Sequence, residues 1–127
     1  MTRTYAAGLT PLSRRKAHIL ADWIVDVIET RLGLGAGEIR QSSRHSMRAV
    51  QARQLAAYLL NTELGLSQSE TARRLRRHRS TVNHSLIRME DSRDDPVFNR
   101  HLEQLTDSLH TLRDVLAGDV HEGEVAA

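Results

Sequence analysis

The 127-residue sequence contains no cysteine, two prolines and four aromatic residues. Without cysteine the chain cannot form a disulfide framework, a thiolate zinc site, an iron–sulfur cluster or a cysteine nucleophile. The prolines and glycines supply too few turns for the many short strands of an all-β sandwich or barrel. Because aromatic side chains are scarce, the core must consist mainly of Leu, Ile, Val and Ala, which suits helices. We therefore expect an all-α fold.

The chain also lacks a long hydrophobic run. No apolar segment approaches the roughly 20 residues of a membrane-spanning helix, and residues 1–13 hold no apolar block typical of a signal peptide. We expect a soluble, cytoplasmic protein without a membrane partner. The length fits one domain, predicted at residues 13–117. A flexible arm at 1–12 should precede it, and a disordered acidic tail at 118–127 should follow.

The formal net charge of +2 conceals a strong segregation of charge. Residues 40–79 hold nine Arg and two acidic residues, whereas residues 89–127 hold ten acidic residues and three Arg. A basic centre of this kind is typical of nucleic-acid-binding domains. The alternative is a solvated surface on which the two halves of the chain attract each other.

Three helices are predicted before residue 76. The first carries an apolar face with Trp23 as an expected core residue, and it ends in the glycine-rich run 33–37. Thr10-Pro11 resembles a helix start, but three basic residues at 14–16 oppose the helix dipole there. Either the helix begins later, which we favour, or phosphates compensate the charge. After a short turn and loop at 38–48, the second helix spans 49–64 and ends at Gly65.

Residues 67–90 show the pattern of a helix-turn-helix. Ser67 and Glu70 form a capping box that starts a short helix to Leu75, and a second helix begins near Arg79 and continues to about Met89. The apolar residues of the motif are Ala72, Leu75, Val82 and Leu86. Arg76 occupies the turn position that often holds glycine.

A long C-terminal helix is predicted from Asp95-Pro96 to residue 117. Its apolar residues are spaced four and three apart, as in the seam of a coiled coil, namely Phe98, Leu102, Leu105, Leu109, Leu112 and Leu116. This seam can pack against its own domain, or it can form a homodimer or dock a partner protein. The fold class expected overall is a small multi-helix bundle that contains a helix-turn-helix and ends in this long helix.

The second helix of a helix-turn-helix enters the major groove of DNA with its N-terminus first. The candidates for reading bases are therefore Arg79, Ser80, Thr81, Asn83 and His84. Arginines of the first helix and the turn are expected on phosphates, because a guanidinium matches two phosphate oxygens. The expected phosphate ligands of the motif are Arg73, Arg74, Arg76, Arg77 and His78, and Arg44, Arg48 and Arg53 extend the basic surface.

Residues 43–59, 65–70 and 80–84 together resemble the C-terminal DNA-binding domain of the bacterial replication initiator DnaA. The resemblance implies a basic loop whose minor-groove arginine falls on His45, beside Arg44. The base-reading Asp-His pair of that family falls on His78 and Arg79, so the docking mode should be shared while the target sequence should differ. No glycine-rich phosphate-binding motif occurs, so an ATP-driven initiator is not expected.

The function expected from these features is sequence-specific binding of double-stranded DNA by a nucleoid-associated transcription regulator. The resemblance suggests the phage, prophage or gene-transfer-agent type, acting with a second protein or RNA polymerase. The alternatives are a replication-control or architectural protein with weak specificity, and a protein-interaction module that uses the C-terminal helix. The seven histidines show no metal-binding spacing, and no nucleophile lies near a plausible base. We therefore expect no enzyme activity, no metal and no cofactor.

Overall fold

The computed structural model describes residues 12–41 and 46–118. Within these ranges the chain forms five α-helices and a short 3-10 helix, with no strand, which confirms the all-α fold. The elements are α1 (Arg14–Arg31), η1 (Glu38–Arg40), α2 (Met47–Thr62), α3 (Gln68–Leu75), α4 (Arg79–Ser92) and α5 (Pro96–Ala117). None of these helices is long and apolar enough to cross a membrane.

Side-chain caps determine where the helices begin. Ser13 caps α1 by accepting a hydrogen bond from the Lys16 backbone N–H, so the helix begins at Arg14, after Thr10-Pro11. The three basic residues still occupy its first turn, so the expectation that a later start would remove them from the helix end is wrong. Asp95 caps α5, and Pro96 occupies its first turn as predicted. Leu12, which we expected to end the flexible arm, is instead buried against the core. The rest of that arm and residues 119–127 of the tail lie outside the described residues.

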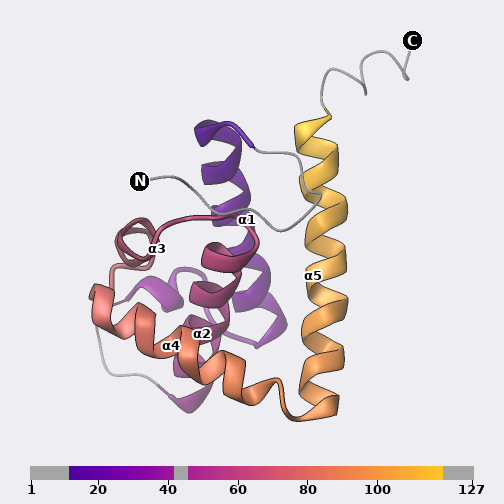
Figure 1. Ribbon diagram of the computed structural model, residues 1–127. Helices are drawn as coiled ribbons and strands as arrows, with labels where there is room; N and C mark the ends of the chain where they lie inside the picture. The colour runs from indigo at the N-terminus through magenta and orange to yellow at the C-terminus, as the bar shows by residue number, and fades with distance from the viewer. Residues whose placement is uncertain (1–11, 42–45, 119–127) are drawn as a thin grey trace.

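Helix α2 is the central element, and it contacts α1, α3, α4 and η1. Its buried residues include the small side chains of Ala49, Ala52, Ala56 and Ala57. Alanine lets a neighbouring helix approach closely without loss of helix propensity. The short α3–α4 pair is therefore held against a rigid centre, and Figure 1 shows α3 and the start of α4 on the side of the bundle away from α5.

The expectation that Trp23 belongs to the core is wrong, because its side chain is 36% exposed. The inward face of α1 is formed by smaller residues, among them Leu20, Ile24 and Ile28. Trp23 lies at the edge of this face, beside Leu109 of α5. Periodicity alone does not separate the centre of an apolar face from its edge.

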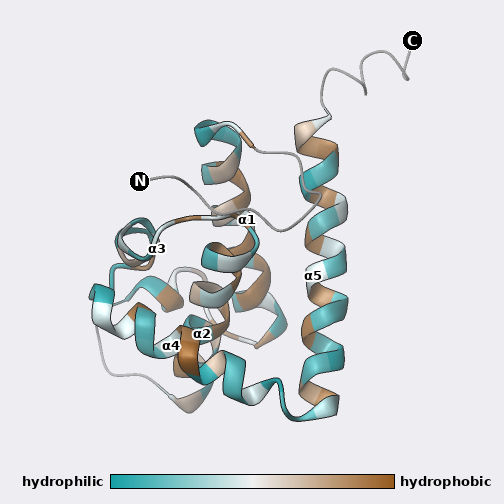
Figure 2. Ribbon diagram, viewed as in Figure 1, coloured by the Kyte–Doolittle hydropathy of each residue, from teal (hydrophilic) through white to brown (hydrophobic). Residues whose placement is uncertain are grey.

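The seam of α5 packs against its own domain. Leu102 and Leu109 are buried, while Phe98, Leu105, Leu112 and Leu116 are partly buried against the same core. Figure 2 shows apolar and hydrophilic residues alternating along this helix. Of the alternatives, packing against its own domain is thus the one that the structure shows, and the seam is not left open as a partner or dimer face. Ile28 and Leu59 lie against Leu105 and Leu109 of α5.

A polar cluster joins α2, α4 and the start of α5. The Tyr58 hydroxyl donates to Glu90 at 2.5 Å and accepts from Arg93 at 2.9 Å, and Arg93 also donates to Asn99 at 2.7 Å. Burial is the main cause that raises the pKa of Tyr58, and the hydrogen bond to Glu90 raises it further. Tyr58 therefore stays a neutral donor that ties the C-terminal end of α4 to the core.

Candidate nucleic-acid interface

Helices α3 and α4 form the predicted helix-turn-helix. The capping box is present in full: the Glu70 N–H donates to the Ser67 hydroxyl at 3.0 Å, and the Ser67 N–H donates to the Glu70 carboxylate at 3.1 Å. Thr71, Ala72 and Leu75 bury the inner face of α3. The box and the buried face together orient the short α3, which would be marginal in isolation.

The turn between the two helices places Arg76 in the left-handed region, with φ of 54° and ψ of 46°. Glycine is the usual residue at this position of a helix end, because a Cβ atom is strained there. Among the described residues, Arg76 is the only one other than glycine that has a positive φ. An arginine at this position is therefore strained, and it places an exposed cation three residues before the start of α4.

We predict that Arg76→Gly will raise the stability of the fold. Relief of left-handed strain should exceed the added entropy of the unfolded chain by about 0.5–1 kcal/mol. Urea unfolding of the wild type, Arg76→Gly and Arg76→Ala measures this difference. The alanine variant is the matched control, because it removes the same charge but keeps the Cβ atom. Equal stability of the two variants would show that Arg76 is not strained.

The outward face of α4 carries all of the predicted base-reading residues. Its exposed residues include Arg79, Ser80, Thr81, Asn83 and His84. On the opposite face Val82, Ser85 and Met89 are buried, and Leu86 is half-buried. The predicted inward placement of Val82 is therefore confirmed. Sequence reasoning missed Ile87, which is 54% exposed on this helix although it is apolar.

Three polar contacts hold side chains in the first two turns of α4 and at its cap. The His78 ring caps the helix, with Nδ1 accepting from the Ser80 N–H at 3.4 Å and lying 2.9 Å from the Ser80 hydroxyl. Gln68, at the start of α3, donates to the side-chain oxygen of Asn83 at 3.3 Å. The amide of Asn83 is thereby oriented by the first helix of the motif, not by solvent alone.

The predicted phosphate ligands divide into groups with different surroundings. Arg48, Arg73, Arg76 and His78 are exposed. Arg77 is half-buried, and its guanidinium donates to the backbone oxygens of Arg76 and Gln41. Burial lowers the pKa of Arg77. Arg44 and His45 lie outside the described residues.

Two of the expected phosphate ligands are placed differently by the structure. Arg53 is buried, and its Nε donates to the Ile39 carbonyl at 3.0 Å. Burial lowers its pKa, with the cation of Arg77 as the second cause. Arg74 pairs with Asp22 at 2.9 Å. Both side chains are therefore engaged within the domain, Arg53 by an acceptor of η1 and Arg74 by an acceptor of α1.

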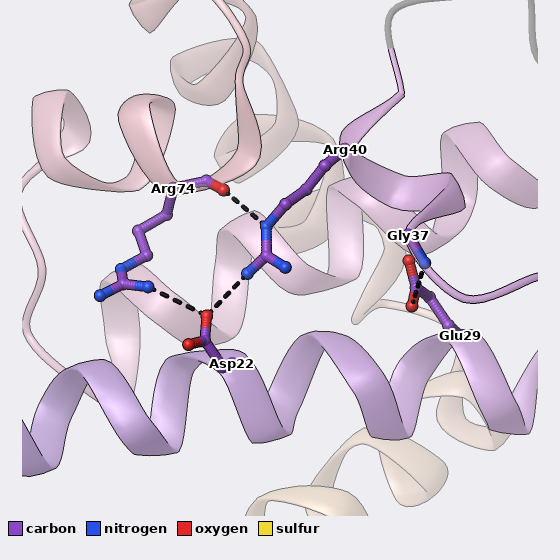
Figure 3. A network of polar contacts seen from close by, with 5 residues as sticks. All are labelled: Asp22, Glu29, Gly37, Arg40 and Arg74. Atoms are coloured by element: carbon purple, nitrogen blue, oxygen red, sulfur yellow. Dashed lines mark hydrogen bonds and ion pairs between the residues drawn. The ribbon is translucent and has the colours of Figure 1, made fainter.

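A polar network that sequence reasoning missed connects α1 to the helix-turn-helix (Figure 3). Asp22 accepts from Arg40 and Arg74 at 2.9 Å each, and the Nε of Arg40 donates to the Arg74 carbonyl at 2.9 Å. The buried Glu29 carboxylate accepts from the backbone N–H groups of Gly37 at 3.0 Å and Ile39 at 2.9 Å. The segment that carries η1 thus fastens the C-terminal end of α3.

No simple sequence signal marks this network. Asp22 and Glu29 lie seven residues apart, which places them on related faces of α1, but isolated acids in a helix usually face solvent. Within residues 12–41 and 46–118, no three His, Asp or Glu side chains are grouped to hold a metal ion. The chemistry on this side of the molecule is that of arginine guanidinium groups, hydroxyls and amides.

Comparison with known families identifies a related domain. A family model described as the bacterial dnaA protein helix-turn-helix matches residues 21–88, which is more than half of the chain. No curated protein and no solved structure matches it. The matched range runs from within α1 into α4, and so it contains both the motif and the Glu29 network. The chain therefore belongs to the bacterial DnaA helix-turn-helix family, a family of DNA-binding domains whose partner is double-stranded DNA.

Proposed function

We propose that the protein is a sequence-specific regulator that reads the major groove of DNA with the N-terminal half of α4. The observation that carries this proposal is the exposed set of donors and acceptors at Arg79, Asn83 and His84, opposite the buried Val82 and Met89. A helix packed through one face and polar on the other fits the roughly 12 Å width of the groove.

Each polar side chain on this face matches a particular base edge. The guanidinium of Arg79 can donate two hydrogen bonds to guanine, and the amide of Asn83 can pair with adenine in the same bidentate way. The methyl group of Thr81 suits the methyl group of thymine, and the exposed Ile87 offers a further apolar contact. These residues define a mixed sequence, not a preference for A·T or G·C alone.

The flanking cations would hold the helix at the groove. The exposed Arg73 and Arg76 precede α4 within the motif, and the exposed Arg48 at the start of α2 adds a further cation. Arg77 would add its charge from a half-buried position. Contacts with phosphates carry little sequence information, but they position the reading helix and dominate affinity.

The target should differ from the sequence bound by the initiator. The base-reading Asp-His of the family pattern falls on His78 and Arg79 here, and His78 is occupied as the cap of α4. We infer a role in transcription control of the phage, prophage or gene-transfer-agent type. A second protein or RNA polymerase would meet the outer face of α5, which carries Glu103, Asp107 and Asp114.

Selection of binding sites from a random duplex library at near-physiological salt tests the proposal. We expect one enriched motif, unlike the initiator's site, with an unchanged motif for the control variant Arg100→Gln on α5. A motif equal to the initiator's site would point instead to replication control. Retention without enrichment, lost as salt rises, would mean architectural binding and would contradict the proposal. Enrichment that needs added RNA polymerase would support the action with a partner.

A further inference from the structure

A basic cleft lies between the first half of α1 and α3, outside the helix that reads bases. It has a volume of about 380 Å³ and contains five arginines, Arg14, Arg40, Arg73, Arg74 and Arg76. Two carboxylates, Asp22 and Glu70, share the lining. The cleft therefore has an excess of positive charge and enough room for a phosphate with part of its sugar.

The arginines of the cleft divide by what they already bind. Arg40 and Arg74 are held by Asp22 at 2.9 Å, so their charges are compensated within the protein. Arg14 contacts Glu70 at 3.4 Å, with 71% of its side chain exposed. The guanidinium groups of Arg73 and Arg76 have no hydrogen bond or ion pair within the described residues, and both side chains are exposed. The guanidinium groups without a protein partner in the described part of the chain are thus those nearest to the turn before α4.

The start of α1 gives an independent indication. Its first turn contains Arg14, Arg15 and Lys16 and no acidic residue, although the helix dipole disfavours cations at this end. Lys16 is explained by its hydrogen bond to the Leu116 carbonyl at 2.6 Å. Arg14 gains little from an exposed ion pair with Glu70. A bound anion would account for a cation at this position.

We propose that this cleft binds a phosphate of the DNA backbone, and that Arg14 of α1 acts there together with Arg73 of α3. The inference rests on the proposed function, and it extends the DNA contact beyond the helix-turn-helix. Arg76 lines the cleft and is separated from α4 by two residues. A duplex held by α4 therefore passes close to the mouth of the cleft.

Fluorescence anisotropy of the full chain on its selected duplex, measured across a series of salt concentrations, tests this site. Arg14→Gln should reduce the log–log salt slope by about 0.9, the value for one phosphate contact. Arg15→Gln is the matched control, because it removes the same charge from the neighbouring position, which does not line the cleft. If Arg14 and Arg73 contact the same phosphate, the Arg14→Gln/Arg73→Gln double variant should lose less binding free energy than the sum of the losses of the two single variants.

The possible outcomes separate this site from the proposed function and from a free anion. Equal slopes for Arg14→Gln and Arg15→Gln on a duplex that the wild type binds specifically would overturn the cleft site alone. Failure of the wild type to select any duplex would overturn the proposed function. A third outcome would be that inorganic phosphate, at constant ionic strength, stabilises the wild type but not Arg14→Gln, while the two variants have equal salt slopes on DNA. The cleft would then bind a free anion, and the proposed contact with the DNA backbone would be overturned.

Discussion

Replacement of Glu29 by alanine is expected to lower the free energy of unfolding by about 2–4 kcal/mol, one of the two largest effects that we predict. Glu29 is 3% exposed, and its two carboxylate oxygens accept from the N–H groups of Gly37 and Ile39. Hydrogen bonds to a charged group contribute about 1.5–3 kcal/mol each, and the buried Ile39 N–H would lose its acceptor at a cost of about 1–3 kcal/mol. The two losses are not additive, because both N–H groups belong to one short segment.

The same substitution should weaken DNA binding, although Glu29 does not lie near α4 in the sequence. Ile39 accepts from Arg53 of α2, Arg40 donates to the Arg74 carbonyl, and the Gln41 carbonyl accepts from Arg77 of the turn. Glu29 therefore fixes the segment on which the end of α3 and the turn rest. A site held about 1 Å less accurately loses much of its activity.

Urea unfolding and anisotropy on the selected duplex measure the two effects. Asp26→Asn is the matched control, because Asp26 belongs to the same helix and is exposed. Its substitution should change stability by less than 0.5 kcal/mol. The free energy of unfolding of Glu29→Gln should fall between those of Glu29→Ala and Asp26→Asn, because the glutamine amide keeps one oxygen that can accept a hydrogen bond. A Glu29→Ala variant as stable as Asp26→Asn would show that the segment 33–41 is held by other contacts.

The parts of the fold that depend on local chemistry could be predicted from the sequence. The capping box at Ser67 and Glu70 and the Asp95-Pro96 start are determined by residues three or fewer positions apart. The buried face of α4 could be predicted because Val82 and the apolar residues that follow it recur at the helical period. The exposure of the base-reading residues follows from the same period, since one face of a helix leaves the other to solvent.

The parts that depend on contacts between distant segments could not be predicted. The seam of α5 reads equally as a dimer face or as an internal face, and the choice depends on the apolar surface that α1 and α2 leave uncovered. Arg53 was expected on the surface because of its charge, but the Ile39 carbonyl lies within hydrogen-bonding distance. Glu29 carries no local signal, because its partners are backbone N–H groups eight and ten residues away, at Gly37 and in η1.

Arg79→Ala is the second substitution with a large expected effect. It should lower affinity for the selected duplex by about 1–3 kcal/mol, roughly 5- to 150-fold, and it should relax the preference at one base pair. Arg79 is the first residue of α4 and is exposed. A guanidinium at this end of a reading helix can meet the O6 and N7 atoms of guanine, and no other residue of the first turn has two donors in that geometry.

The stability of this variant gives the decisive comparison. The first turn of α4 has no acidic residue, and a cation there opposes the helix dipole by a few tenths of a kcal/mol. Arg79→Ala should therefore be at least as stable as the wild type while it binds its site more weakly. Arg88→Ala is the control, because Arg88 is an exposed arginine on the same helix. It should change the affinity for all duplexes by the same factor. Loss of affinity without loss of base preference in Arg79→Ala would assign Arg79 to a phosphate and remove it from the reading set.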